Sequence, residues 1–195
     1  WEVSIATFEA ADLQRPPPEQ SIVFVGSSSI TGWSDLEADM APLTAIKRGF
    51  GGSTMVDVNR YRDRIVTNYL PRIVVVYAGE NDIAGGGSVD ALLEQYEKFS
   101  RHLEERLPDT KLCFISIKPS PTRIAFWGEM EWANFRLERL VQTDPERLCY
   151  IDITALMLDE YGDPKEALYL ADRLHINRQA YLLWGDLIRP VLEAL

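Results

Sequence analysis

Two segments of the chain carry side chains that could act together in nucleophilic chemistry. Three consecutive serines, Ser27 to Ser29, directly follow a short apolar run, and Asp172 precedes His175 by three positions. A serine hydroxyl becomes a nucleophile when an imidazole removes its proton, and a nearby carboxylate can orient that imidazole. The residue types therefore allow acyl transfer through a serine, provided that the fold brings the two segments together.

Of the two histidines in the chain, His175 is the better candidate for a catalytic base. His102 stands among arginine and glutamate residues in a predicted helix, where a solvated face accounts for it. The aspartate three positions before His175 can reach the ring nitrogen that faces away from a serine, which would fix the tautomer. His175 is therefore the predicted base.

Each polar cluster also has a plainer interpretation when it is taken alone. Serines after a strand commonly form turns through bonds to nearby backbone, and Asn81-Asp82 could do the same. Adjacent glycines such as Gly51-Gly52 mostly supply backbone angles that other residues avoid. The pair Asp172 and His175 could be a local contact before the last helix. Only the combination of these clusters favours catalysis.

The elements that must position these residues alternate along the chain. Fully apolar runs predict strands buried on both faces, and apolar residues at helical spacing predict amphipathic helices. Thr54, Ser88 and Asn177 are typical helix N-caps, and Pro190 is expected to kink or restart the last helix. We expect strands over 21–26, 43–48, 73–77, 111–117 and 148–153, helices over 3–13, from Trp33, over 54–69, 88–107 and 129–142 and from 177, and loops over 79–87, 118–127 and 154–176.

Five strands that alternate with helices predict a parallel sheet, because right-handed crossovers place helices on both faces. The expected fold class is therefore α/β, a three-layer α/β/α sandwich with a five-stranded parallel sheet. A flavodoxin-like strand order, 2-1-3-4-5, is favoured over a barrel, since five units cannot close one. At 195 residues the chain suits one domain over 1–195, in which 1–18 form an N-terminal helix and a proline-rich entry segment.

Four polar segments follow the carboxyl ends of predicted strands. Three of them begin at Gly26, Gly49 and Gly79, and the fourth runs from Asp172 to His175 after a longer excursion. In a parallel sheet these ends all open on one edge. We therefore expect side chains that are far apart in the sequence to meet at this edge.

The composition argues against several classes of partner. The formal net charge of −10 disfavours binding to nucleic acid or to anionic membrane surfaces. No run approaches the roughly 20 apolar residues that span a bilayer, so membrane insertion is not expected. Cys113 and Cys149 lie in predicted strands and are interpreted as reduced core residues rather than as a disulfide or metal pair. Because the numbering begins at Trp1 rather than at a methionine, the sequence leaves export and localisation open.

The polar motifs resemble those of the SGNH hydrolases, also called the GDSL esterase/lipase family, from residue 21 to the terminal helix. Gly26-Ser27-Ser28 is similar to the Gly-Asp-Ser of that family, and Gly52 to the glycine of its second block. Gly79-Glu80-Asn81-Asp82 is similar to its Gly-x-Asn-Asp, and the segment from Asp172 to His175 to its Asp-x-x-His. The chain departs from the pattern at Ser27, where the family usually has an aspartate.

The resemblance implies a two-step acyl transfer that needs no metal or cofactor. Ser28 would attack an ester carbonyl, His175 would take its proton, and Asp172 would orient the ring. The oxyanion would be held by the backbone N–H groups of Ser28 and Gly52 and by the side-chain amide of Asn81. The expected activity is hydrolysis of carboxylic esters, with a small-molecule ester as the partner and the oligomeric state left open.

A proline-rich, aromatic loop over 119–127 follows the fourth predicted strand on the same edge. It is either a rigid connection packed by its own aromatic rings, or a wall of the acyl pocket formed by Ile124, Phe126 and Trp127. No insertion is large enough to form a lid, which favours short acyl groups such as acetyl. Carbohydrate deacetylase, lysophospholipase and thioesterase activities remain alternatives on the same scaffold.

Two further interpretations come from other classes of protein. The serine- and threonine-rich turn over 27–32 could cradle the phosphate of FMN, as in a flavodoxin-like protein. That interpretation leaves Asn81, Asp172 and His175 without roles. A non-catalytic relative that binds carbohydrate or lipid would be expected to lack a member of the triad, and all members are present. A serine esterase therefore accounts for the largest number of these residues.

Overall fold

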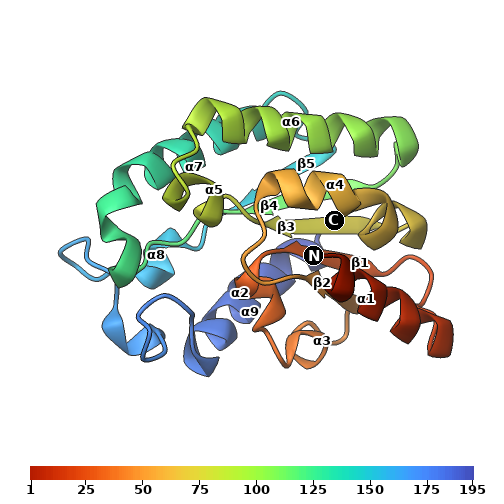
Figure 1. The fold of residues 1–195 in the computed structure, drawn as a ribbon, viewed down its shortest axis with the longest axis horizontal. Coiled ribbons are helices and arrows are strands. Elements are labelled where there is room, and N and C mark those ends of the chain that lie inside the picture. Colours follow the sequence, from red (N-terminus) through yellow and green to blue (C-terminus); the bar gives the residue numbers. More distant parts are fainter.

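In the computed structural model, which describes residues 1–195, five parallel strands form one sheet in the order β2-β1-β3-β4-β5. The strands are β1 (Ile22–Gly26), β2 (Ala45–Gly49), β3 (Ile73–Tyr77), β4 (Lys111–Ile115) and β5 (Leu148–Ile151). At the centre of the sheet, Ile22 of β1 lies opposite Ala45 on one side and Ile73 on the other. The predicted fold class and strand order are confirmed (Figure 1).

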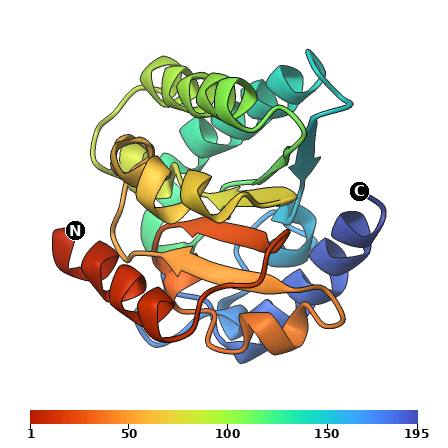
Figure 2. The same ribbon diagram turned by 90° about the vertical axis from the view of Figure 1, so that its right-hand side faces the viewer.

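Helices cover both faces of this sheet, as the two perpendicular views in Figures 1 and 2 show. One face carries α1 (Glu2–Gln14), α4 (Met55–Ile65), α6 (Val89–Arg106) and α7 (Trp127–Val141). The other face carries α2 (Ser28–Thr31), α3 (Leu36–Asp39), α8 (Thr154–Met157) and α9 (Arg178–Glu193). The connections contain α5 (Glu80–Ala84) and the short 3₁₀ turns η1 (Thr67–Tyr69), η2 (Pro121–Phe126) and η3 (Glu166–Leu168).

Two apolar cores lie on the two faces of the sheet. Val23 and Val25 of β1 point into the core that α4, α6 and α7 cover, while Ile22 and Phe24 point into the core under α9. Successive side chains of a strand face opposite sides, so a strand covered on both faces must be apolar throughout. This requirement explains the uninterrupted apolar runs of the sequence.

Several predicted boundaries were wrong. The helix expected from Trp33 begins only at Leu36, as α3, and α2 precedes it over Ser28–Thr31. The loop predicted over 79–87 contains α5. The predicted loop over 118–127 contains η2, and the segment over 154–176 contains α8 and η3. One-turn helices were missed because four or five residues are too few to show a helical period. The restart expected at Pro190 was wrong, because α9 continues through this residue, which lies at an exposed position where water can bond the freed carbonyl.

The helix caps agree with the sequence pattern. Thr54 and Asp57 form a reciprocal capping box at α4, and the side chains of Ser88 and Asn177 accept the backbone N–H groups that begin α6 and α9. No helix is both long enough and apolar enough to cross a membrane. Cys113 and Cys149 lie opposite each other on β4 and β5 as free thiols.

Candidate active site

The candidate site lies at the carboxyl edge of the sheet, next to its central strand. The chain passes from β1 to β2 on one side, whereas β3 lies on the other side of β1. Ligands of open α/β sheets bind where the strand order reverses in this way, because the loops there separate and leave a crevice. Ser28 follows β1 and Asn81 follows β3, so both predicted residues flank this switch point.

A sharp turn after β1 places Ser28 at the first position of α2. Gly26 has a φ of +143°, and a Cβ atom there would lie 1.8 Å from the carbonyl oxygen of Tyr77. The next amide, that of Ser27, donates to the same carbonyl at 3.0 Å. Only glycine fits against β3 at this point, so the turn direction is set by backbone packing.

The three serines differ in their exposure to solvent. Ser27 and Ser29 are each only 2% exposed, whereas Ser28 is half-buried. The backbone carbonyl of Ser29 accepts the hydroxyl of Tyr181 on α9 at 2.9 Å. Ser28 therefore carries the accessible hydroxyl of this turn, and its two neighbours belong to the packed structure beneath it.

Three N–H donors without complete partners lie on Ser28 itself and on the loops that follow β2 and β3 at the same edge of the sheet. Its own N–H is at the first position of α2, where no intrahelical acceptor exists. The N–H of Gly52 donates to no acceptor, and the Asn81 amide gives one N–H to the Ser53 carbonyl at 2.9 Å, which leaves its second N–H free. A Cβ atom on Gly51 would lie 3.8 Å from the Cβ of Ser28, so this glycine loop adjoins the serine. Such a group of donors can stabilise a developing oxyanion.

Asn81 is fixed by the contacts of the residue that follows it. Both carboxylate oxygens of Asp82 accept the backbone N–H of Met55, at 2.9 and 3.1 Å, which ties α5 to the start of α4. Burial raises the pKa of the Asp82 carboxyl above its ordinary value, although the Met55 amide opposes the shift. The start of α5, which carries Asn81, is thus fixed against the start of α4.

Asp172 and His175 form a direct pair on the loop before α9. Oδ2 of Asp172 lies 2.6 Å from Nδ1 of His175, and Oδ1 accepts the backbone N–H groups of Leu174 and His175 at 3.0 and 2.9 Å. The bond to the His175 ring, followed by these amides, holds the pKa of the Asp172 carboxyl well below its usual range. With Nδ1–H directed at the carboxylate, Nε2 remains available to accept a proton.

The loop that carries His175 leads into α9, and α9 packs against α2. The Tyr181 hydroxyl reaches the Ser29 carbonyl, and the ring of Tyr181 stacks on Trp33 with centroids 5.2 Å apart. No hydrogen bond joins the Ser28 hydroxyl to the His175 ring in this structure. The structure therefore brings Asp172 and His175 into contact, and places their loop at the end of the sheet that carries Ser28.

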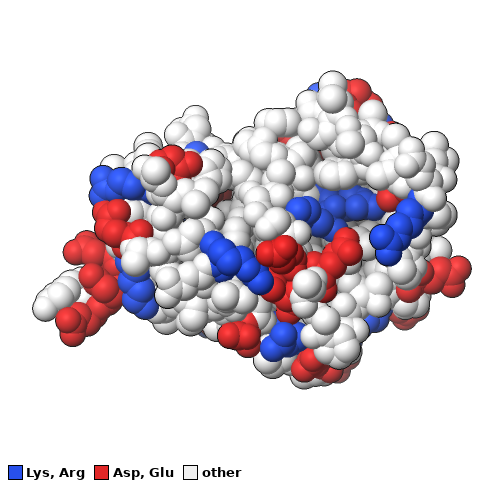
Figure 3. Space-filling view, turned by 90° about the horizontal axis from the view of Figure 1, so that it is seen from below, with Lys and Arg blue, Asp and Glu red and all other residues white.

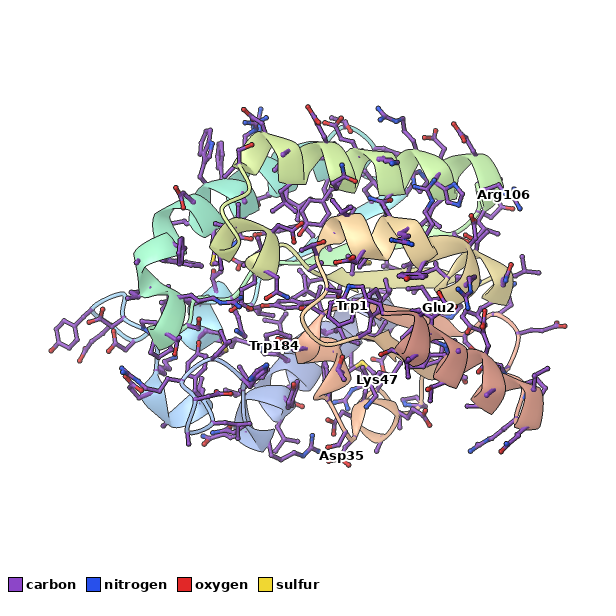
Figure 4. All side chains as sticks on the ribbon, in the orientation of Figure 1. Trp1, Glu2, Asp35, Lys47, Arg106 and Trp184 are labelled. Carbon is purple, nitrogen blue, oxygen red and sulfur yellow. The ribbon has the colours of Figure 1, made fainter.

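Trp1 is a neighbour of the site that sequence reasoning missed. Its indole lies 3.1 Å from where a Cβ of Gly52 would stand and packs edge-on against Phe50 at 5.8 Å. The ring is 47% exposed and lies at the end of α1 nearest the middle of the molecule (Figure 4). The sequence predicted a helix over 3–13, but no local pattern could show that Trp1 at the start of this helix contacts the loop after β2.

The predicted pocket residues of η2 and its neighbour occupy different surroundings. Phe126 and Trp127 pack partly buried against the core under α6 and α7. Ile124 is 44% exposed and lines a hollow of about 530 Å³ together with residues between Asp159 and Ala167. A role of these three residues in an acyl pocket stays a prediction.

Comparisons with known proteins identify the family and the fold of this chain. The sequence matches the GDSL-like lipase/acylhydrolase family model over residues 20–183. None of the curated proteins is significantly similar in sequence.

Solved structures of low sequence identity share the fold. A GDSL-like lipase from Bacteroides thetaiotaomicron is 21% identical with a TM-score of 0.84, and 98% of each chain is covered. A lipase/acylhydrolase from Enterococcus faecalis is 18% identical with a TM-score of 0.72, over 90% of this chain and 96% of that chain. An acetyl xylan esterase is 17% identical with a TM-score of 0.73, over 88% of this chain and 98% of that chain.

The family match includes the serine turn, both glycine-containing loops and the Asp172–His175 pair. It spans most of the chain, and the sheet order is the one predicted from the alternation of strands and helices. This protein therefore belongs to the GDSL-like lipase/acylhydrolase family.

Proposed function

We propose that this protein is a serine esterase that hydrolyses carboxylic esters through an acyl-enzyme. The observation that carries the proposal is a half-buried Ser28 at one sheet edge with N–H donors of Ser28, Gly52 and Asn81 that have no complete set of partners. The Asp172–His175 pair supplies an oriented base on the same edge of the sheet. A member of the GDSL-like acylhydrolase family with these groups has what ester hydrolysis requires.

In the proposed mechanism, the Ser28 oxygen attacks the ester carbonyl while Nε2 of His175 takes the hydroxyl proton. The carbonyl oxygen becomes an oxyanion, which accepts the three N–H groups, and each such donor contributes roughly 2.7–4 kcal/mol to catalysis. The alcohol leaves with the proton from His175, and Ser28 keeps the acyl group. Water then repeats the attack with the same proton transfers, which releases the acid and restores Ser28.

Short acyl groups, acetyl above all, are the proposed substrates. Trp1 stands against Gly52, so its indole occupies space beside the carbonyl oxygen that a long acyl chain would need. One protein of similar fold is an acetyl xylan esterase, which supports acetyl esters of carbohydrate as one group of substrates to test. Lysophospholipids and thioesters are the other candidate classes.

The test is a substrate series with the wild type and three serine variants. We expect hydrolysis of 4-nitrophenyl acetate and butyrate, with activity falling for the decanoate ester. Ser28→Ala should lower kcat by about 10⁴-fold or more, as for other nucleophile deletions. Ser27→Ala and Ser29→Ala are the matched controls and should each lose far less, because these hydroxyls are buried away from solvent.

A serine-directed phosphonate followed by peptide mapping gives an independent readout. The label should appear on Ser28, and it should be absent from the Ser28→Ala variant. Labelling of Ser27 or Ser29, or full activity of the Ser28→Ala variant, would refute the assignment of the nucleophile. A protein that hydrolyses none of the acyl esters, acetylated xylan, lysophospholipid or thioester probes would refute the function itself.

A further inference from the structure

Arg123 has a guanidinium group that the protein itself leaves unbonded. The Arg123 side chain is 20% exposed, and its nearest ionic contact joins a terminal nitrogen to Oε1 of Glu80 at 3.5 Å. The guanidinium group donates no hydrogen bond within the protein. Arg147, which is 12% exposed, instead bonds Asp144 and Ser100 at 2.9 Å each. Because a guanidinium carries five N–H donors, Arg123 retains capacity for an additional acceptor.

The position of Arg123 is fixed on two sides by segments of the candidate site. The preceding residue, Thr122, donates its backbone N–H to the carbonyl of Arg173 at 3.2 Å and its hydroxyl to the carbonyl of Asp172 at 2.8 Å. On the other side, Glu80 directly precedes Asn81 in the chain. Arg123 therefore lies between the loop of the proposed base and the proposed oxyanion donor.

Glu80 does not neutralise Arg123, because the Glu80 carboxylate is already paired with a lysine. Nζ of Lys118 donates to both carboxylate oxygens of Glu80 at 2.9 Å, and the Tyr77 hydroxyl donates to Oε2 at 3.0 Å. The Lys118 and Glu80 side chains are 1% and 5% exposed, so this pair is almost fully desolvated. One carboxylate between two cations leaves a net positive charge at Arg123.

The local charge decides what this group can bind. The chain as a whole has a formal net charge of −10, but exposed charges more than about 10 Å away are screened at ordinary ionic strength. On the face seen in Figure 3, acidic and basic side chains lie next to each other rather than in separate regions. The planar fork of the Arg123 guanidinium matches the oxygens of carboxylate and phosphate groups.

We propose that Arg123 binds an anionic oxygen group on the alcohol part of the ester, so that preferred substrates carry a carboxylate or phosphate there. This inference rests on the proposed esterase function. His175 gives its proton to the leaving alcohol, so the alcohol part lies toward the His175 loop, and Thr122 bonds that same loop. The sequence showed Arg123 only as one residue of an aromatic loop, since its partners come from distant segments.

The experiment compares esters that differ in charge on the alcohol side. The probes are 4-acetoxybenzoate, 4-acetoxyphenyl phosphate and the neutral methyl 4-acetoxybenzoate. Arg123→Gln should lower kcat/KM for the anionic esters by roughly 10-fold or more, mainly through KM, as expected for loss of a charge-assisted hydrogen bond. The neutral ester should change less than about twofold, and salt should weaken the preference of the wild type for anions. The carboxylate and phosphate probes distinguish the two sources of the anion.

Two further variants act as controls. Arg136→Gln removes the same charge from α7, where the arginine pairs with Asp90 and is 40% exposed, and should leave the ratio between anionic and neutral esters unchanged. Arg123→Lys keeps the charge without the fork and should retain part of the anion preference, which also covers the case that Arg123→Gln does not fold.

Equal losses for neutral and anionic esters in the Arg123 variants would overturn the proposal, because they would assign Arg123 a structural role through Glu80. Unchanged kinetics with all three esters would also overturn it. A wild-type protein that hydrolyses none of the probes would instead count against the proposed function. These outcomes are therefore distinguishable.

Discussion

The two halves of the candidate site are built in opposite ways. Ser28, Gly52 and Asn81 follow the three adjacent strands β1, β2 and β3. Their loops are joined by the backbone bond from Phe50 to Gly26 and by the Asn81 side chain, which donates to the Ser53 carbonyl. Asp172 and His175 lie in a long segment with little regular structure, and their side chains are 49% and 40% exposed. One half is anchored directly on the ends of packed strands, and the other is a turn on the surface.

The two halves also differ in how far their contacts support the fold. Beside Asn81, the Glu80–Lys118 pair is almost fully buried, so this half depends on groups that the folded state must keep paired. The carboxylate of Asp172 instead bonds the imidazole of His175 and the amides of its own turn. We therefore expect substitutions in the first half to change stability and activity together, and substitutions in the second half to change activity alone.

The largest expected effect is that of Asp172→Asn on catalysis. An amide cannot stabilise the imidazolium and favours the wrong tautomer of His175, so kcat should fall by about 10⁴-fold. Because the pair is exposed, the melting temperature measured by circular dichroism should stay close to that of the wild type. A loss of several degrees would show that the surface turn supports the fold and would break the comparison.

The direction of the Asp172 pKa also predicts the pH dependence of the wild type. Because the folded pKa lies below that of the unfolded chain, the carboxylate is ionised at all pH values above the ordinary carboxyl range, and its small contribution to stability is lost only as the pH falls below that range. The acid limb of kcat/KM should therefore show one ionisation, with a limiting slope of one. A slope of two would indicate that a second group titrates with the base.

The largest expected effect on stability comes from Lys118→Met. This change leaves the Glu80 carboxylate buried without its closest cation, which should cost about 3–5 kcal/mol in the free energy of unfolding, measured with urea. Arg173→Gln is the matched control, since the Arg173–Glu166 pair is 59% exposed on both sides and is screened by solvent, so this variant should lose far less stability. Equal losses in the two variants would remove the distinction between the halves.

Asn81→Ala should affect both properties. Loss of one oxyanion donor lowers kcat by about 10²–10³-fold, and loss of the bond to the Ser53 carbonyl should reduce stability by roughly 1 kcal/mol. Kinetics with 4-nitrophenyl acetate and a urea titration measure the two effects in one preparation. Unchanged kcat with reduced stability would leave Asn81 as a structural residue only.

The smallest expected effect is that of Thr122→Val. The isosteric change removes the hydroxyl that donates to the Asp172 carbonyl but keeps the backbone bond to Arg173, so activity should fall only a few-fold, for a cost near 1 kcal/mol. Measuring kcat/KM of Thr122→Val and of Asp172→Asn with the same ester compares the two losses of activity. A loss above 100-fold would show that the surface turn depends on η2 and is not self-contained.

The sheet and the positions of the polar loops were predictable because they depend on short patterns. Apolar runs such as residues 73–77 identify strands buried on both faces, and Thr54 identifies a helix start by its own hydroxyl. The site beside Ser28 followed from the rule that parallel strands end at one edge. Two contacts could not be predicted in the same way: that of Trp1 with Gly52 and that of Lys118 with Glu80. Each joins segments that are far apart in the sequence, and their approach depends on the packing of the whole chain.

The turn at Gly26 has an evolutionary consequence. The absence of room for a Cβ beside the Tyr77 carbonyl is a property of the backbone and does not depend on whether any ester is hydrolysed. In a descendant of this protein that had lost catalysis, the side chain at position 28 would be free to drift, whereas the glycine at position 26 would still be under purifying selection. Retention of that glycine in a relative is therefore a record of shared ancestry and architecture, and only the serine that follows two positions later reports on chemistry.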